Sequence, residues 1–575
     1  MYRKVFSCVG EYKKYAILAP VSITGEVVME VLIPIVMANI INNGINKGDI
    51  GYIVKMGLLM VGMAIISLCF GAMAGRFAAV AGMGFSKNLR SRLFKKVQDF
   101  SFSNIDKFST ASLVTRLTTD VTNAQNAFMM IIRTAFRAPI MLVFALVMTI
   151  RINAKLSLVF LIVTPVLAII MVFVLTHAHP RFLKMLEKYD KMNSRIQENL
   201  IGINVVKAFV REPYEKKNFD ETAGDVRKAQ VFAEKLIIMI APFMQICIYT
   251  CIVAILWFGG NMVIDGDMKI GYLSSFITYV MQILMSLMML SMIFMMIIIS
   301  RASIERISEV LSEEPEIKDC EGESAHAEDG SIVFENVDFS YFKDKNNLAL
   351  ENINLSIKSG ETIGIIGGTG SSKSSLVQLI PRLYDTLSGK VLVGGHDVKE
   401  YSLDVLRQEV AMVLQKNVLF SGSIRDNLRW GDENATDEEI VDACKSACAD
   451  DFINGFPDGY ETELGQGGGN VSGGQKQRLC IARALIKKPR IIILDDSTSA
   501  VDTATDSNIR KAFREKLGDT TTIIIAQRIS SVKDADRIVV MDDGKINAVG
   551  THEELLECNE IYREVYESQQ KGAEE

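Results

Sequence analysis

Long apolar runs in residues 1–300 constrain this chain more than any other feature of its sequence. A helix needs about 20 consecutive apolar residues to cross a bilayer. Four runs have that length without a single charge, at 56–75, 156–176, 236–264 and 270–300. Two more contain isolated charges, at 15–46 with Glu26 and Glu30 and at 128–150 with Arg133 and Arg137. The sequence therefore predicts six membrane spans.

Composition and flanking charges agree with a multi-pass protein of the cell membrane. The 575-residue chain is 49% hydrophobic and has a mean hydropathy of +0.22, which a water-soluble protein rarely reaches, and the apolar excess is concentrated in residues 1–300. Lys and Arg gather at 87–96 and 181–217, whereas the short segments 42–49 and 264–269 are poor in them. The positive-inside rule then places both termini in the cytoplasm. No removable signal peptide is expected in residues 1–14.

Other classes of protein are disfavoured by charge and by cysteine spacing. A net charge of -6 and a pI of 5.7 give no reason to expect nucleic acid as a partner. The nine cysteines form no C-x-x-C pair, so neither a zinc site nor a disulfide framework is predicted.

The residue pattern divides the chain into two domains and a linker. Residues 1–311 form the predicted membrane domain, whose spans continue into the cytoplasm as amphipathic helices. The acidic segment 312–330 is the predicted linker. From 331 to 575, short β-branched runs alternate with helical segments, beginning with the run at 331–340. This alternation predicts an α/β domain with a mainly parallel sheet.

A glycine-rich segment, here called the phosphate loop, joins a predicted strand to a predicted helix. It comprises Gly367, Gly368, Thr369, Gly370, Ser371, Ser372, Lys373, Ser374 and Ser375. In the pattern G-x-x-x-x-G-K-[ST], backbone N–H groups bind phosphate oxygens, the lysine reaches the β- and γ-phosphates, and the following hydroxyl can ligate Mg2+. Lys373 and Ser374 match these roles. Ser372 stands where the pattern has glycine.

Two neighbouring carboxylates end the apolar run IIILDD at 491–496. The first, Asp495, is placed to hold Mg2+. The second, Asp496, stands where a general base would lie next to attacking water. Together with the phosphate loop, this pair predicts a site for Mg-ATP.

The segment NVSGGQKQRLCIARAL at 470–485 resembles the signature sequence of ATP-binding cassette (ABC) proteins. The resemblance assigns Tyr341 to stacking on adenine, Gln415 to the lid loop and the metal, and residues 499–502 to a loop that crosses the dimer interface. It implies that the signature completes the site of a partner chain through Ser472, Gly473, Gly474 and Gln475. The segments SLVTRLTTDV and ENLIGINVVKAFVRE resemble the coupling regions of six-span ABC exporters, near 100–120 and 205–220. The resemblance covers essentially the whole chain.

Three positions depart from the family pattern. Asp496 replaces the usual catalytic Glu, and its shorter side chain would hold the carboxylate about 1.5 Å back, a displacement that can cost on the order of a hundredfold in rate. Gln527 replaces the switch histidine and cannot carry a positive charge. Ser372 is the third departure. The chain is therefore expected to bind Mg-ATP and to hydrolyse it slowly.

The resemblance implies that cassettes work as pairs, each phosphate loop facing the signature of the other. In this chain the signature is nearly regular, whereas the base and switch positions are altered. The chain therefore resembles the degenerate half of a heterodimeric multidrug exporter. The predicted activity is ATP-driven export of an amphiphile, such as a drug, lipid or peptide, with hydrolysis mainly at the site completed with the partner. Two alternatives remain: a homodimeric exporter with Asp496 as a weak base, and a regulatory ATP-binding subunit that gates instead of pumping.

Some residues of the spans are candidates for the substrate pathway. Glu26 and Glu30 share one helix face because they are four residues apart, and intramembrane carboxylates usually face a partner or an aqueous cavity. They either contact substrate or carry a proton, or they pair structurally with Arg133 or Arg137. In the last span, Met285 and Met292 belong to a methionine series that suits varied apolar ligands or serves ordinary helix packing.

Overall fold

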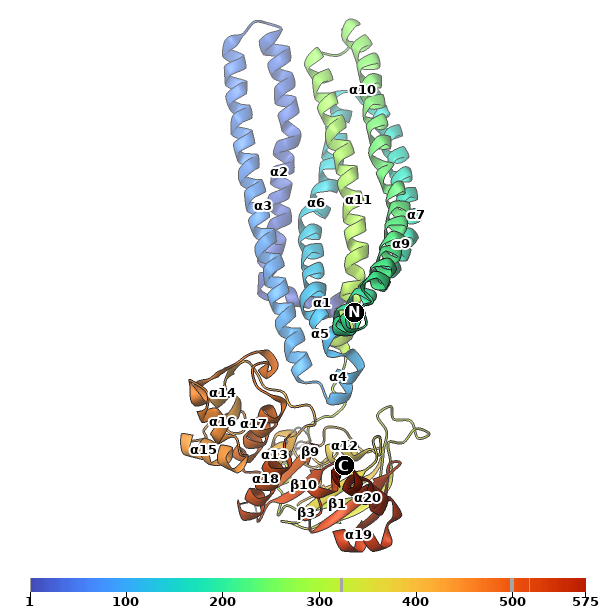
Figure 1. The fold of residues 1–575 in the computed structure, drawn as a ribbon. Helices are drawn as coiled ribbons and strands as arrows, with labels where there is room; N and C mark the ends of the chain where they lie inside the picture. Colours follow the sequence, from blue (N-terminus) through green and yellow to red (C-terminus); the bar gives the residue numbers. More distant parts are fainter. Residues whose placement is uncertain (1, 321–323, 497–500, 517, 575) are drawn as a thin grey trace. The chain divides into compact units, whose positions relative to one another are not determined.

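The computed structural model describes residues 2–320, 324–496, 501–516 and 518–574. The chain forms two compact units, which Figure 1 traces from blue to red. Unit 1 contains Met1–Asp99 and Ser109–Glu313. Unit 2 contains Phe100–Phe108 and Glu314–Glu575. A short stretch that precedes the third span thus belongs to the same unit as the C-terminal half of the chain.

Unit 1 is entirely helical in its described residues, and its long helices run side by side (Figure 1). The elements are α1 (Tyr2–Phe6), η1 (Ser7–Tyr12), α2 (Lys13–Asn39), η2 (Ile40–Ile45), α3 (Ile50–Gln98), α5 (Thr110–Thr115), η3 (Arg116–Asp120), α6 (Val121–Ile152), α7 (Ala154–Ile201), α8 (Ile203–Ala208), α9 (Glu212–Ile238), α10 (Ile240–Ile264) and α11 (Ile270–Ser312). Within the described ranges, six helical stretches are long and apolar enough to cross a membrane. The six predicted spans are therefore confirmed, and α3 and α7 extend far past their apolar runs.

Polar contacts between α2 and α11 satisfy backbone groups near a proline. Pro34 lies inside α2 and has no N–H to donate to the carbonyl of Glu30. Gln282 on α11 donates to that carbonyl at 3.3 Å. Tyr279 donates to the carbonyl of Val31 at 2.7 Å, and Ser275 to that of Pro34 at 2.6 Å. The Gln282 bond thus supplies the one donor that the proline removes, in a part of the chain where lipid offers none.

An ion-pair cluster joins α11 to the short π-helix η3 before the third span. Asp120 is fully buried and accepts a hydrogen bond from Nε of Arg306 at 2.7 Å. Arg116 donates to the carbonyl of Arg306 at 3.0 Å and pairs with Glu309 at 2.8 Å. The contact with the Arg306 guanidinium offsets the free energy that burial of the Asp120 carboxylate costs.

Unit 2 is built around a six-stranded sheet in the order β12-β11-β3-β10-β9-β6. Its strands are β3 (Thr362–Gly367), β6 (Val410–Val413), β9 (Ile491–Asp495), β10 (Thr521–Ile525), β11 (Arg537–Asp542) and β12 (Lys545–Gly550). All neighbours pair in parallel except β11 and β12. Every residue of β9 is buried, as expected of a strand covered on both faces. The α/β fold class is confirmed.

The run at 331–340 was expected in the parallel sheet, and this expectation is wrong. It forms β1 (Ile332–Phe339) of a separate antiparallel sheet, in the order β2-β1-β4-β5. The other strands are β2 (Leu350–Ile357), β4 (Ser388–Val393) and β5 (His396–Asp397). The segment between β1 and β2 is too short for the crossover that a parallel pair requires, so the two strands fold back antiparallel.

Helices surround the two sheets and complete unit 2. They are α4 (Phe102–Phe108), α12 (Lys373–Gln378), α13 (Leu403–Glu409), α14 (Ile424–Leu428), α15 (Asp437–Ser446), α16 (Asp450–Asn454), α17 (Gly473–Ile486), α18 (Thr503–Lys516), α19 (His552–Cys558) and α20 (Glu560–Glu574), with a small pair of strands, β7 (Gly422–Ser423) and β8 (Glu463–Leu464). Alternate residues of β9 enter two different cores: Ile492 and Leu494 pack on the α17 side, and Ile491 and Ile493 on the β1 side.

The start of β4 provides a test of the antiparallel sheet. Gly389 has a φ of +76°, and a Cβ there would lie 2.2 Å from the carbonyl oxygen of Asn336 on β1. We expect Gly389→Ala to destabilise unit 2 by about 1–3 kcal/mol, because the side chain is strained in this conformation and displaces β1. Thermal unfolding of the full-length chain measures the effect. Gly518→Ala, at a position with open space, is the control and should change little; equal effects would contradict the assignment.

Candidate nucleotide-binding site

The phosphate loop lies between β3 and α12. Gly367 has no room for a side chain, since a Cβ would lie 2.2 Å from the carbonyl oxygen of Met541. Gly368 and Gly370 have open space on their Cβ side, and Gly370 has a φ of +88°. Ser372 is the N-cap residue of α12 but makes no side-chain capping bond, and its φ of +65° is a left-handed conformation that costs an L-residue about 1–2 kcal/mol. The missing glycine therefore coincides with a conformation that favours glycine.

The side chain of Lys373 folds over this loop. Its ammonium group donates to the carbonyls of Gly367 at 2.9 Å and Gly368 at 2.8 Å, and to the hydroxyl of Ser371 at 3.2 Å. Burial lowers the pKa of Lys373, while Asp496 and Asp495 act in the opposite direction. A partly buried cation over open glycine backbone is an arrangement that suits a bound phosphate.

A hydroxyl and a carboxylate meet beside this lysine. Ser374 donates to Oδ1 of Asp495 at 2.9 Å. Asp495 is 2% exposed, and burial raises its pKa, an effect that the Ser374 hydrogen bond opposes. Hard oxygen ligands of this kind suit Mg2+. In the described residues no cluster of three or more His, Cys, Asp and Glu side chains is placed to hold a metal.

Asp496 lies between two glutamines. The side-chain amide of Gln527 donates to Oδ2 of Asp496 at 3.0 Å, and Gln415 forms a second side-chain hydrogen bond to the same carboxylate. Asp496 has a φ of +48°, and its backbone N–H donates to the carbonyl of Ile525 at 3.0 Å. Burial raises the pKa of Asp496, whereas the two glutamines and Lys373 lower it. The three residues predicted for the base, switch and lid positions are thus in direct contact.

Tyr341 lies next to the phosphate loop with 43% of its surface exposed. Its hydroxyl is 2.8 Å from the hydroxyl of Ser375 on α12. A second ring, Tyr384, packs edge-on against it at 5.2 Å between centroids. Sequence analysis did not single out Tyr384, because no spacing rule connects it to Tyr341. An exposed ring face beside the loop can accept a planar base.

The signature residues begin helix α17. Ser472 caps the helix: its hydroxyl accepts from the N–H of Gln475 at 3.3 Å, and the Gln475 side chain accepts from the N–H of Ser472 at 2.8 Å. Gly473 and Gly474 form the first turn. These capping bonds stay within that turn, and Ser472 is exposed. Of the interface loop predicted at 499–502, residues 499 and 500 lie outside the described residues.

The carboxylates of the first span pair with an arginine of the third. Nη1 of Arg137 contacts Glu26, and Nη2 lies 2.8 Å from Oε1 of Glu30. Of the two arginines considered from sequence, the structure pairs Arg137 with both carboxylates. Met285 and Arg137 also line a cavity of about 200 Å3. Met292 is exposed and is not among the residues that line this cavity.

The sequence comparisons match both halves of the chain. The family model of the ABC transporter transmembrane region matches residues 16–303, and the family model described as ABC transporter matches residues 350–499. The chain belongs to the ABC transporter family. An uncharacterised ABC transporter ATP-binding protein of Bacillus subtilis (strain 168) is 38% identical over 567 residues, which is 99% of this chain and 98% of that protein.

Other relatives of this ABC transporter have named activities. An ATP-dependent lipid A-core flippase of Desulfotalea psychrophila is 34% identical over 85% of this chain and 85% of its own length. A fatty acid ABC transporter ATP-binding/permease protein of Mycobacterium bovis is 33% identical over 82% of this chain and 75% of its own. The solved structure of a bacterial Atm1-family ABC exporter with ATP bound has a TM-score of 0.82 at 23% identity, covering 97% of this chain and 98% of that one.

These likenesses confirm the six-span exporter fold and a multi-pass membrane protein with a cytoplasmic ATP-binding domain. They confirm ATP as the nucleotide of the domain at the level of the family.

The conformation of Ser372 gives a prediction with a definite sign. We expect Ser372→Gly to raise the stability of the ATP-binding domain by about 1 kcal/mol, because glycine adopts positive φ without strain. Ser375→Gly, inside α12, should lower stability by about as much, because glycine is a poor helix former. Thermal unfolding of the full-length chain without nucleotide compares the two. A loss of stability in both variants would contradict strain at Ser372.

Proposed function

We propose that this chain is one half of a heterodimeric ABC exporter that moves amphiphilic substrates out of the cell. Its own ATP site binds Mg-ATP and hydrolyses it slowly, and its signature completes a faster site on the partner chain. The contact between Gln527 and Asp496 carries this proposal. Both positions differ from the family pattern, and the Gln527 amide donates to one oxygen of the Asp496 carboxylate.

Binding of ATP at this site follows from the geometry of the phosphate loop. Lys373 exchanges its carbonyl partners for phosphate oxygens, and the backbone N–H groups at the start of α12 bind the same anion. Ser374, Asp495 and Gln415 would hold Mg2+, which supplies charge stabilisation to the transferring phosphoryl group. Tyr341 orients the nucleotide by stacking on its base.

Slow hydrolysis follows from the residues around Asp496. A general base must reach the attacking water within hydrogen-bond distance. Asp496 is one methylene shorter than Glu, and two glutamines already donate to its carboxylate. Gln527 cannot supply the positive charge of a protonated histidine to the γ-phosphate. This chain's own residues therefore bind nucleotide better than they activate water.

The signature is the part of the chain that serves the partner. Ser472 begins α17, a helix of 14 residues whose N-terminal N–H groups and dipole attract anions. The cap leaves the Ser472 hydroxyl free to donate its proton, since that hydroxyl accepts in the capping bond. The γ-phosphate of an ATP bound to the partner is the proposed recipient.

The substrate is proposed to be a lipid-like amphiphile. Two relatives are named for lipid A-core and fatty acid transport, which supports this class over a hydrophilic solute. Arg137, with Glu26 and Glu30, places charge inside the spans, and the thioethers of Met281 and Met285 line the adjoining cavity. A charged group beside a flexible apolar surface suits a molecule with a polar head and an apolar body.

A homodimeric exporter is the second candidate, and one observation favours it. Burial raises the pKa of Asp496, which makes its carboxylate a stronger base than that of an exposed aspartate. In this case Asp496 serves as the base of two identical slow sites. Its protonation then removes activity as the pH falls through the raised pKa, so the acid limb of the ATPase profile lies higher than an ordinary Asp would give.

The altered positions predict a gain of function. We expect Asp496→Glu combined with Gln527→His to raise hydrolysis at this site by about ten- to a hundredfold, because the base regains its reach and the γ-phosphate regains a cationic partner. ATP turnover by the purified transporter, with the partner's base neutralised, measures it. Asp496→Asn in the same background is the control, and an unchanged rate in the double variant would contradict the assignment.

The kind of dimer is tested by native mass. We expect the tagged chain, extracted mildly from its own membrane, to carry one different chain of similar size. Fast hydrolysis should then disappear when the partner's base is neutralised and persist in Asp496→Asn. Two copies of this chain alone, with activity lost in Asp496→Asn, would exclude the heterodimer and support the homodimeric exporter.

A further inference from the structure

Unit 2 contains a continuous series of contacts from Tyr341, next to the phosphate loop, to helix α4. We propose that Tyr384 is a positioning residue through which α4 responds to the base of the bound nucleotide, separately from the phosphates. The inference rests on the proposed function in one respect, that the base stacks on Tyr341.

The ring of Tyr384 connects three other rings. It packs edge-on against Tyr341 at 5.2 Å between centroids, and it lies 5.6 Å from Phe339 at the end of β1. Its remaining aromatic neighbour is Phe102, the first residue of α4, at 6.1 Å in an edge arrangement. Edge-on aromatic pairs have a preferred geometry, so a rotation of Tyr341 changes the packing of Tyr384 and, through it, of Phe102.

The hydroxyl of Tyr384 adds a directional contact to the same helix. It donates to Oδ2 of Asp106 on α4 at 2.8 Å. Burial and this carboxylate both raise the pKa of Tyr384, so the phenol remains a donor at every physiological pH. One side chain thus touches α4 twice, through its ring at Phe102 and through its hydroxyl one helical turn later at Asp106.

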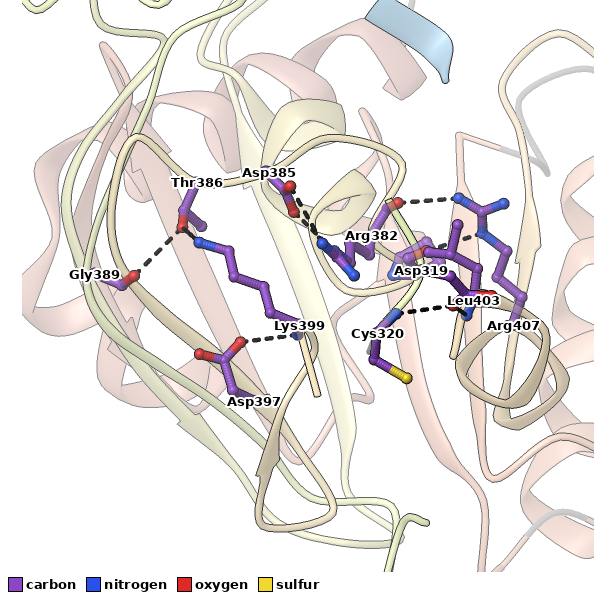
Figure 2. Close-up of polar contacts among 11 residues, drawn as sticks. Asp319, Cys320, Arg382, Asp385, Thr386, Gly389, Asp397, Lys399, Leu403 and Arg407 are labelled. Carbon is purple, nitrogen blue, oxygen red and sulfur yellow. Dashed lines mark hydrogen bonds and ion pairs between the residues drawn. The ribbon is translucent and has the colours of Figure 1, made fainter. Parts of the chain in front are cut away.

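The segment that carries Tyr384 is braced on both sides, as Figure 2 shows for its neighbours. The guanidinium of Arg382 donates to Asp385 at 2.9 Å, so an ion pair spans position 384. Arg407 on α13 donates to the carbonyl of Arg382 at 3.1 Å, and Lys399 donates to Thr386 at 3.4 Å. Because these contacts hold the backbone on both sides of Tyr384, a rotation of the Tyr341 ring is expected to shift the ring and hydroxyl of Tyr384.

Helix α4 has a second attachment, to the chain that leaves α11. The side chain of Asn104 is buried; it donates to the carbonyl of Glu314 at 3.1 Å and accepts from the N–H of Glu316 at the same distance. The Tyr384 contacts and the Asn104 contacts therefore meet on a helix of seven residues. A shift of α4 is transmitted to residues 314–316, immediately after the last span.

Hydrogen exchange of α4 tests the inference in the full-length transporter as isolated from membranes. Saturating Mg-ATP should slow exchange of the amides at 102–108 by about fivefold in the unaltered chain, a change of the size that one such hydrogen bond gives. Magnesium tripolyphosphate has the phosphates but no base, so it should leave these amides unchanged. Equal protection by both compounds would overturn the proposal.

Matched variants separate positioning from folding. Tyr384→Phe keeps the ring and removes the hydroxyl, and Asp106→Ala removes the acceptor of that hydroxyl. Each variant should lose most of the ATP-dependent protection of α4. Each should keep its ATP affinity within about twofold, because neither side chain touches the nucleotide. The double variant should lose no more than either single one. Tyr460→Phe is the control, because Tyr460 also donates to an aspartate, Asp450, at 2.6 Å, away from α4.

The outcomes distinguish this inference from the proposed function. Full protection of α4 in Tyr384→Phe, or the same loss in Tyr460→Phe, would overturn the role of Tyr384 and leave ATP binding and export as proposed. Failure of the unaltered chain to bind ATP would overturn both.

Discussion

The absence of water in the hydrocarbon core is the constraint on which unit 1 depends. Every backbone N–H and C=O in that layer must find a partner within the protein, so the spans are helices throughout. Pro34 leaves the carbonyl of Glu30 without a helical donor, and Gln282 of α11 donates to it, while Tyr279 and Ser275 donate to the neighbouring carbonyls of Val31 and Pro34. The first and last spans are therefore joined by hydrogen bonds to backbone carbonyls around Pro34, one of which, that of Glu30, has no donor within its own helix.

The ATP site of unit 2 depends instead on backbone groups of the phosphate loop that lie outside the hydrogen bonds of the sheet and of helix α12. Residues 368–372 of the phosphate loop lie between β3 and α12, outside the sheet and the helix, and Gly368 and Gly370 leave open space on their Cβ side. The same availability explains why Lys373 bonds to two loop carbonyls. Binding of a phosphate replaces contacts that are already polar, so little reorganisation is required.

Periodicity and motif spacing predicted most of this architecture. Apolar length alone located the six spans, and strand-loop-helix order located the phosphate loop and IIILDD. What sequence reasoning missed depends on tertiary contacts. It placed the run at 331–340 in the wrong sheet, because β-branched runs do not reveal strand direction. It offered Arg133 and Arg137 equally, since residues four apart share a face. The Tyr384–Asp106 contact joins residues 278 positions apart, where local pattern carries no information.

The division of the chain into two units determines which truncated fragments keep unit 2 intact. The backbone passes between the units at 99/100, 108/109 and 313/314, so a single break near the linker does not separate them. A soluble fragment made from 331–575 would leave α4 behind. The side of the Tyr384 ring that packs against Phe102 would then face water. Such a fragment would expose apolar surface that the intact chain covers. We expect it to self-associate through this surface, independently of the pairing of cassettes.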